Sequence, residues 1–306
     1  ERVIVIGTDI GVRGGVFLAT QGLYAKYGPN RILDAPLAES SIVGVGIGAA
    51  MNGLRPVCEI QFADFIHPAY NQIANEAARM FYRTGGQYPV PMVIRAPYGG
   101  GVGGGLYHSQ SIEATFAHVP GLKVVVPATP ADAKGLLKTA IRDNNPTLFL
   151  EPKKGYRMIR GPIPEDQGCV PFGEARVSRP GRDLTVLAYG MMHFYALQAA
   201  ESAAKEGLDV EVVDLRTLNP LDSAGVLAAV RRTGKALIAY EDNKFVGYGA
   251  ELAAQIAEDA FTALDAPLLR VAAPDAPAAP YSHPLQDAFL PGPRAILDGI
   301  RTLARY

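Results

Sequence analysis

The sequence predicts an α/β protein with two tandem domains, each built around a mostly parallel sheet. Three observations support this fold class. Short apolar runs alternate with helix-length amphipathic segments along almost the whole chain, and the alternation stops once, in a glycine- and proline-rich stretch near the middle. The chain also has 306 residues, 48% of them hydrophobic, which is enough for two cores. We therefore expect a first domain over residues 1–152, a connection over 153–182 and a second domain over 183–306.

The first domain is predicted to contain six strands and five helices. The expected strands are Val3–Ile6, Arg31–Asp34, Pro56–Phe62, Pro91–Arg95, Lys123–Val126 and Thr147–Leu150. The expected helices are Val16–Tyr27, Glu39–Met51, Ala69–Arg83, Ile112–Ala117 and Ala131–Arg142. Thr129-Pro130 marks the start of the last helix, because a capping hydroxyl precedes a proline at the first helical position. Such alternation favours a parallel sheet covered on both faces.

The connection is predicted from composition, since glycine, proline and charge accumulate there without any periodicity. The alternation then resumes in the second domain. Its expected strands are Leu184–Tyr189, Val210–Asp214, Ala236–Tyr240 and Leu268–Val271, and its expected helices are Tyr195–Lys205, Ser223–Arg231, Ala250–Phe261 and Ala295–Ala304.

Charge and composition exclude several classes of partner. A net charge of −1 supplies no general attraction for nucleic acid or an anionic membrane, so neither is expected as a partner. No apolar run approaches the roughly 20 residues of a membrane helix. The two cysteines, Cys58 and Cys169, lie far apart and are interpreted as buried or incidental thiols in a reducing compartment. The first residues lack the layout of a signal peptide, and we expect a cytoplasmic protein in a bacterium or a mitochondrial matrix protein in a eukaryote.

Three segments at predicted strand ends contain charged residues, a histidine or glycines that packing alone does not explain. Asp34–Gly44 runs from a strand into a glycine-containing helix and places Glu39 at the helix start, and Glu59–Pro68 also joins a strand to a helix start. Gly99–Ser111 has six glycines in its first seven positions, and His108 follows three residues after the last of them. Because glycine is costly to order, this run indicates close backbone approach to a ligand, or mobility. Strand ends of open α/β sheets are where ligands bind.

Together these segments resemble the beta subunits of thiamine-diphosphate-dependent 2-oxo acid dehydrogenases. The resemblance continues through Phe116–Val125, Asp132–Leu137, Leu148–Lys153, Asp214–Pro220 and Gly247–Glu251. It implies a pyrimidine-binding domain followed by a transketolase C-terminal-like domain. The implied activity is oxidative decarboxylation of a 2-oxo acid with thiamine diphosphate, followed by transfer of the acyl group to lipoamide on a dihydrolipoyl acyltransferase core.

The resemblance also implies roles for individual residues. Glu39 matches the residue that hydrogen-bonds a pyrimidine ring nitrogen and so activates the thiazolium carbon, and His108 matches an active-site histidine that assists acyl transfer. These two residues are the predicted catalytic pair. Leu37, Gln61 and Phe65, with Glu39, match positions that contact the cofactor. His67 stands close to this pocket where related chains tend to carry an apolar or aromatic residue, and we expect it to influence substrate choice.

One motif of the family is absent from the sequence. The Gly-Asp-Gly motif that holds magnesium and the diphosphate occurs nowhere in the chain. The resemblance therefore implies an alpha subunit that supplies most of the magnesium site, in a heterotetramer of two alpha and two beta chains that is active only when complete. It further implies a potassium ion bound by backbone carbonyls at Met92, Ala140, Asp143 and Asn145.

Several alternatives remain open from the sequence. Branched-chain 2-oxo acids are favoured as substrates by the segments at 61–65 and 106–110, with pyruvate or acetoin as the alternatives. Two other functions are the C-terminal half of a split transketolase and a catalytically silent assembly subunit. Members of the family usually begin with a helix before the first strand, so we expect this sequence to be trimmed or partial.

Overall fold

The computed structural model describes residues 2–166 and 168–306. Its first half contains the strands β1 (Val3–Gly7), β2 (Ile32–Asp34), β3 (Arg55–Glu59), β4 (Val93–Tyr98), β5 (Lys123–Val125) and β6 (Thr147–Pro152). The helices there are α1 (Leu23–Tyr27), α2 (Glu39–Met51), α3 (Ala78–Arg83), α4 (Glu113–Ala117), α5 (Pro130–Arg142) and α6 (Gly155–Met158). A π-helix at Gln72–Ala77 leads into α3, and short 3₁₀ turns occupy Ala63–Phe65, His67–Ala69 and Gly105–Tyr107.

The second half adds the strands β7 (Arg176–Arg179), β8 (Leu184–Ala188), β9 (Val210–Asp214), β10 (Thr217–Asn219), β11 (Ala236–Asn243) and β12 (Leu269–Ala273). Its helices are α7 (Gly190–Ala204), α8 (Ser223–Thr233), α9 (Tyr248–Asp259), α10 (His283–Phe289) and α11 (Pro293–Leu303), with a 3₁₀ turn at Phe261–Ala263. Among the helices of the described residues, none is long and apolar enough to cross a membrane.

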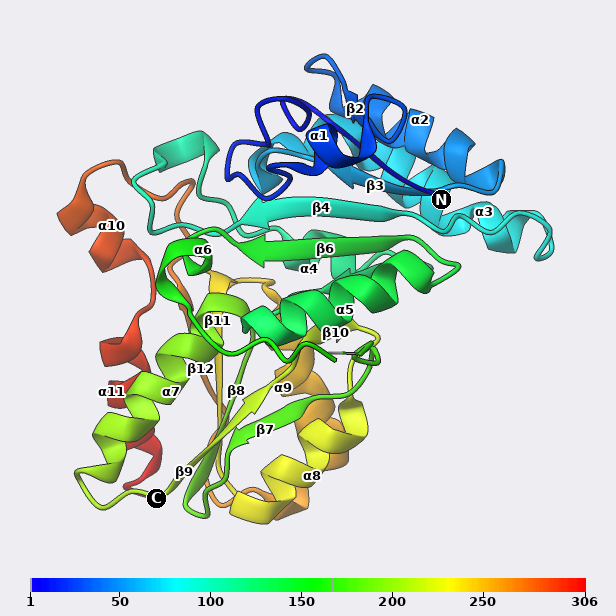
Figure 1. The fold of residues 1–306 in the computed structure, drawn as a ribbon. Helices are drawn as coiled ribbons and strands as arrows, with labels where there is room; N and C mark the ends of the chain where they lie inside the picture. The colour runs from blue at the N-terminus through cyan, green and yellow to red at the C-terminus, as the bar shows by residue number, and fades with distance from the viewer. Residues whose placement is uncertain (1, 167) are drawn as a thin grey trace.

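The described strands form two sheets. The first has the order β10-β5-β6-β4-β3-β1-β2, and all its neighbours are parallel except β10 against β5. The second has the order β12-β11-β8-β9-β7, and only β7 runs antiparallel to its neighbour. Figure 1 shows the first sheet with its helices in the upper half and the second sheet with α7, α8, α9 and α11 in the lower half. The prediction of two α/β domains with mostly parallel sheets is confirmed.

Helix α2 packs very closely on the first sheet, and this closeness explains one of its glycines. A Cβ on Gly46 would lie 2.5 Å from Cys58 Sγ on β3 and 3.0 Å from the Met92 side chain. Ile42, Val43 and Ile47 are buried on the same helix. The helix begins at Glu39, as the sequence predicted, and its packing fixes the position of that residue at the edge of the sheet.

The helix predicted over Val16–Tyr27 is wrong for most of its length. Only Leu23–Tyr27 is helical, and Gly22 directly before it has a φ of 82°. Leu18 has a positive φ as well, and the Thr20 hydroxyl donates to the carbonyl of Ile10 at 2.8 Å. Turn hydrogen bonds at the left-handed positions hold this segment against the end of β1, which the apolar spacing does not reveal.

The stretch 153–182 was expected to be a connection without regular structure, but it contains α6 and β7. Strand β7 completes the edge of the second sheet by pairing with β9. Strand β10 was also missed, and it crosses from the second half of the chain to pair with β5 in the first sheet. Both strands are short edge strands whose partners are distant in sequence, so local pattern does not predict them.

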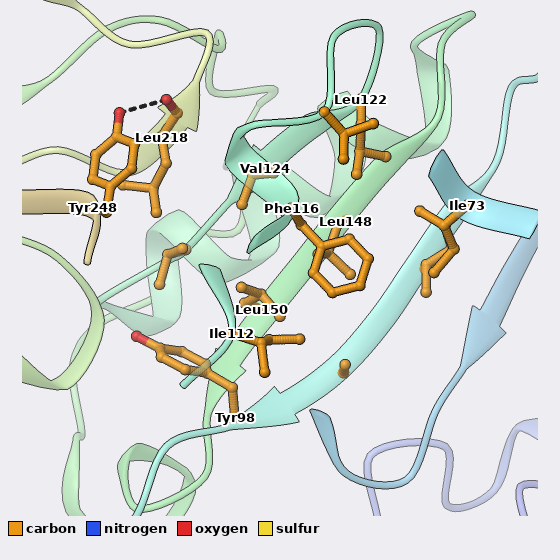
Figure 2. Close-up of a cluster of buried hydrophobic side chains, with 14 of the residues drawn as sticks. Ile73, Tyr98, Ile112, Phe116, Leu122, Val124, Leu148, Leu150, Leu218 and Tyr248 are labelled. Carbon is orange, nitrogen blue, oxygen red and sulfur yellow. Dashed lines mark hydrogen bonds between the residues drawn. The ribbon is translucent and has the colours of Figure 1, made fainter. Parts of the chain in front are cut away.

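The two domains share a buried interface. The main apolar cluster joins residues of the first domain, such as Phe116 and Leu148, with residues of the second, such as Leu218 and Tyr248. Figure 2 shows Phe116 packed in this cluster, and the Tyr248 hydroxyl donates to the Leu218 carbonyl at 2.6 Å. A rigid junction between the domains follows, because separating them would expose this apolar surface.

Glu113 lies in the same interface and makes stability depend on pH. It is fully buried, and its Oε1 accepts a hydrogen bond from the Tyr189 hydroxyl at 2.9 Å. Burial raises the pKa of Glu113 well above its ordinary value of 4.5, and the charge of Asp242 raises it further. A raised carboxyl pKa means that the folded chain binds the proton more tightly than the unfolded chain. The tighter proton binding contributes to the stability of the folded chain. This stabilisation is complete below pH 4.5 and is lost as the pH rises from there through the pKa of Glu113 in the folded chain.

We therefore expect Glu113→Gln to be more stable than the wild type at pH 8 and to lose less stability between pH 5 and pH 8. The neutral amide keeps an acceptor for Tyr189 without a buried charge. Urea unfolding of both proteins across this pH range measures the difference. An identical pH dependence in the two proteins would show that Glu113 is not the responsible group.

Candidate active site

Four neighbouring parallel strands bring the predicted site residues to one edge of the first sheet. Leu37 and Glu39 follow β2, Gln61 and Phe65 follow β3, and the glycine run with His108 follows β4. The strand order β2-β1-β3-β4 places β2 two strand spacings, about 10 Å, from β3. The carboxyl ends of parallel strands meet at this edge, where ligands bind in open α/β sheets.

His108 stands against two aromatic rings that follow β3. Its imidazole lies 4.6 Å from the ring of Phe62 and 5.3 Å from the ring of Phe65, edge-on to both. Phe62 in turn contacts Phe17 at 5.4 Å between ring centroids. His108 and Phe65 are both half-buried. The structure thus brings together two of the predicted site residues and adds Phe62.

Gln61 is held by the end of β1. Its amide Nε2 donates to the Thr8 carbonyl at 3.3 Å and to Asp9 Oδ2 at 3.4 Å. Asp9 has a φ of 61°, in the left-handed region, so the turn after β1 is sharply bent toward Gln61. These contacts orient the carboxamide at the sheet edge between the β2 and β4 ends.

Leu37 and Glu39 occupy the more open part of this edge. Leu37 is 73% exposed, which is high for a leucine beside a site, and Glu39 is half-buried in the first turn of α2. The strand order relates both residues to His108, because β2 and β4 end at the same edge of the sheet.

Three glycines of the run, Gly99, Gly100 and Gly105, lie close to side chains of the second domain. Gly99 has a φ of 84°, and a Cβ on it would lie 2.7 Å from Glu241 Oε1. That carboxyl accepts a hydrogen bond from Gly100 N at 2.5 Å. A Cβ on Gly105 would lie 2.3 Å from the ring of Tyr281. Gly99, Gly100 and Gly105 thus accommodate side chains of the second domain, and the approach of the run to a ligand, or its mobility, stays a prediction.

Two buried charged residues beside His108 were not recognised in the sequence. Lys153 Nζ donates to the His108 carbonyl at 2.7 Å, and Asp64 Oδ1 accepts from the amides of Ser109 at 3.0 Å and Gln110 at 3.1 Å. Asp64 lies inside the segment Glu59–Pro68, and Lys153 is the first residue of the predicted connection. Sequence pattern gave no signal, since charged residues next to turns are ordinarily solvated.

His67 lies at the exposed margin of the same edge. Its Nε2 is 3.4 Å from Gln110 Oε1, so it contacts the segment that carries His108. Its effect on substrate choice stays a prediction.

The four residues predicted to bind potassium lie near the end of α5. Asp143 caps the helix directly after its last turn, which contains Ala140, and the Met92 carbonyl accepts from Thr147 N at 3.0 Å. The Asp143 carbonyl already accepts from Arg55 Nη1 at 2.9 Å, and its carboxylate pairs with Lys123. Each carbonyl has a second lone pair, so a cation would share the site with two positively charged side chains.

No group of three or more histidine, cysteine, aspartate or glutamate side chains that could hold a metal ion is found among the residues that the structure describes. The ligands at this sheet edge are instead a carboxyl, a carboxamide, an imidazole and aromatic faces. This set suits a neutral heteroaromatic ring with hydrogen-bonding nitrogens far better than it suits a diphosphate.

Two family models match the chain. The transketolase pyrimidine-binding domain matches residues 1–158, and the transketolase C-terminal domain matches residues 173–296. A solved structure described as a split gene transketolase, inactive beta4 tetramer, has a TM-score of 0.80 and covers 99% of this chain and 92% of its own. Its sequence identity is 23%, so this likeness shows the fold alone.

Curated relatives match at much higher identity. The 2-oxoisovalerate dehydrogenase subunit beta of Bacillus subtilis (strain 168) is 52% identical over 100% of this chain and 94% of its own length. The pyruvate dehydrogenase E1 component subunit beta of the same organism is 45% identical with the same coverage. The mitochondrial 2-oxoisovalerate dehydrogenase subunit beta 2 of Arabidopsis thaliana is 46% identical over 100% of this chain and 84% of its own length. The chain therefore belongs to the family of thiamine-diphosphate-dependent 2-oxo acid dehydrogenase beta subunits.

Proposed function

We propose that this chain is the beta subunit of a 2-oxo acid dehydrogenase that acts on branched-chain 2-oxo acids. In this reaction the enzyme oxidatively decarboxylates the 2-oxo acid and passes the acyl group to lipoamide on a dihydrolipoyl acyltransferase core. The observation that carries the proposal is the 52% identity over the whole chain to a subunit named for 2-oxoisovalerate, against 45% for the pyruvate relative.

Thiamine diphosphate would supply the electron sink for loss of carbon dioxide. Glu39 would hold a proton at a pyrimidine ring nitrogen, Phe65 would offer an aromatic face, and Gln61 would orient the ring by hydrogen bonding. Leu37 would line the pocket once a partner covers it. His108 would stabilise charge that develops on the substrate and would assist transfer of the acyl group to the lipoyl sulfur.

An alpha subunit would complete the site. The exposed Leu37, the half-open position of Glu39 and the absence of Gly-Asp-Gly from the sequence all support a cofactor shared across an interface. The alpha subunit would supply most of the magnesium ligands, in a complex of two alpha and two beta chains without which this chain is inactive. Potassium at Met92, Ala140, Asp143 and Asn145 stays a further part of the proposal.

The location proposed is the cytoplasm for a bacterial source and the mitochondrial matrix for a eukaryotic one. It is supported by relatives from Bacillus subtilis and by one from Arabidopsis that is named as mitochondrial.

The proposal is tested with the chain co-produced with the alpha subunit of the same organism. Steady-state assays would compare 3-methyl-2-oxobutanoate with pyruvate, using the lipoylated acyltransferase as acceptor. We expect kcat/KM to favour the branched-chain acid by at least about 10-fold, because each apolar methyl group in a matched pocket adds to transition-state binding. A preference for pyruvate would end the branched-chain assignment, and ketol transfer between sugar phosphates would favour the split transketolase. Activity of this chain without the alpha subunit would contradict the shared site.

A further inference from the structure

We propose that Lys153 and Asp64 are positioning residues that hold the backbone of His108 in place for catalysis. This inference rests on the proposed function, because it concerns how the imidazole of His108 is presented to the substrate. Their hydrogen bonds go to backbone groups of residues 108–110 and not to the imidazole.

The contacts form a clamp on three consecutive residues. Lys153 Nζ donates to the His108 carbonyl at 2.7 Å, while Asp64 Oδ1 accepts from the backbone amides of Ser109 and Gln110 at 3.0 and 3.1 Å. The two charges lie 3.6 Å apart, Nζ to Oδ2. The clamp therefore satisfies one carbonyl and two amides of a segment that has no regular structure after Tyr107.

The clamp is anchored on the rigid part of the domain. Lys153 directly follows β6, and its own amide donates to the Tyr98 carbonyl at the end of β4 at 3.0 Å. Asp64 lies in the 3₁₀ turn after β3. The glycine-rich loop that leaves β4 closes on itself, since Gly99 N donates to the Gln110 carbonyl at 2.9 Å. Three adjacent strand ends thus fix the point at which the loop returns with His108.

Burying the charges of Lys153 and Asp64 costs desolvation free energy, so the ion pair needs a further role to account for its presence. The side chains of Lys153 and Asp64 are 0% and 1% exposed. Burial lowers the pKa of Lys153, and the carboxylates of Asp64 and Glu241 act in the opposite direction and favour the charged amine. A buried ion pair seldom adds net stability, but its directional hydrogen bonds specify one geometry for the groups that it contacts.

The same lysine also supports the ring that packs on His108. Lys153 Nζ lies 5.1 Å from the centroid of the Phe62 ring, over its face, and the Phe62 ring lies 4.6 Å from the imidazole. Loss of the lysine would release the His108 carbonyl and weaken the packing of Phe62 at once. Both changes displace the imidazole without removing any group that reacts.

Two variants test the clamp in the complex of the chain with its alpha subunit. Lys153→Met removes the donor, and the double variant Asp64→Asn with Lys153→Met removes both charges and keeps an amide oxygen for Ser109 and Gln110. We expect either to lower lipoyl-dependent kcat by about 10- to 100-fold, because small displacements of a catalytic group have effects of this size. KM for the 2-oxo acid should stay close to wild type. The charge-neutral double variant preserves the test if the single variant fails to fold.

Combination with His108→Asn separates positioning from general stability. If Lys153 acts through His108, the variant His108→Asn with Lys153→Met will be no slower than His108→Asn alone. A further loss by the full factor of Lys153→Met would overturn the proposal, as would wild-type kcat in Lys153→Met. Lys205→Met, at an exposed lysine of the second domain, is the matched control and should leave kcat unchanged.

Hydrogen exchange provides a readout that does not depend on activity. In Lys153→Met we expect faster amide exchange over residues 105–111 and unchanged exchange in α2. Unchanged exchange in the loop would overturn the clamp. The failure of the clamp and the failure of the proposed function can be told apart. If Lys153→Met exchanges faster over residues 105–111 but the wild-type complex decarboxylates no 2-oxo acid, the clamp is supported and the proposed function is refuted.

Discussion

Replacing Glu39 by glutamine is expected to lower 2-oxo acid decarboxylation by the reconstituted complex by at least about 100-fold, the usual effect of removing a group that exchanges a proton during reaction. Glutamine keeps the size of the side chain and its carbonyl, but it cannot share a proton with a ring nitrogen. The effect should fall on kcat, because the amide can still hydrogen-bond the pyrimidine. Release of carbon dioxide, measured with an artificial electron acceptor, follows this step without the acyltransferase.

The control for this prediction is Ser40→Ala, which alters the neighbouring residue in the first turn of α2 and should retain normal turnover. Thermal unfolding of the Glu39→Gln complex should match that of the wild type, since Glu39 is only half-buried and the N-cap of α2 is Ala38. Near wild-type turnover in Glu39→Gln would remove Glu39 from the mechanism and would favour a silent assembly subunit.

Replacing Arg95 by methionine is expected to cause the largest loss of stability, about 3–5 kcal/mol, the usual result of breaking a buried ion pair. Arg95 lies on β4 between Glu59 on β3 and Glu151 on β6, and its contacts with their carboxylates range from 2.5 to 2.8 Å. All three side chains are less than 10% exposed. Methionine would fill the space of the arginine stem and leave two carboxylates facing each other in a buried site.

Urea unfolding at several pH values measures this effect. The Arg95→Met variant should recover stability as the pH falls, because its unpaired carboxyls take up protons; burial already raises the pKa of Glu59 in the wild type. The matched control is Arg301→Met, which breaks exposed ion pairs with Glu206 and Asp298 and should cost far less. An Arg95→Met protein as stable as Arg301→Met would show that the buried network does not support the sheet.

Some elements of the fold could be predicted from the sequence, and others could not. Helix α2 begins at Glu39 as predicted, and strand β9 has the predicted bounds at Val210–Asp214. Strand β9 is a short, mostly apolar run that is buried throughout, and α2 follows a strand end and a turn that contains Pro36. By contrast, the segment after Val16 was expected to be helical and is mostly turns, because a left-handed Leu18 and several glycines override the apolar spacing. Arg95 ends a run predicted as an ordinary strand, and Glu151 lies one residue beyond the predicted strand Thr147–Leu150, so neither was expected to join a buried ion network.

The site shows the same division. The resemblance of the motifs predicted Gln61, Phe65 and His108 as site residues, and the structure places the rings of the last two in contact. The motifs did not indicate Phe62, Asp64 or Lys153. The contacts of these residues with the His108 segment depend on which strand ends are neighbours. The glycine run was recognised as unusual, and the structure adds that Gly99, Gly100 and Gly105 lie against side chains of the second domain.

The sequence by itself determined the class of fold, the two domains and the family, because these depend on local periodicity and on motifs in a fixed order. Only the tertiary structure decided which charged residues are buried together and how β10 joins the two halves of the chain. The physical reason is that burial and ion pairing arise between segments distant in the chain, so their energies are set by strand order and not by any local pattern.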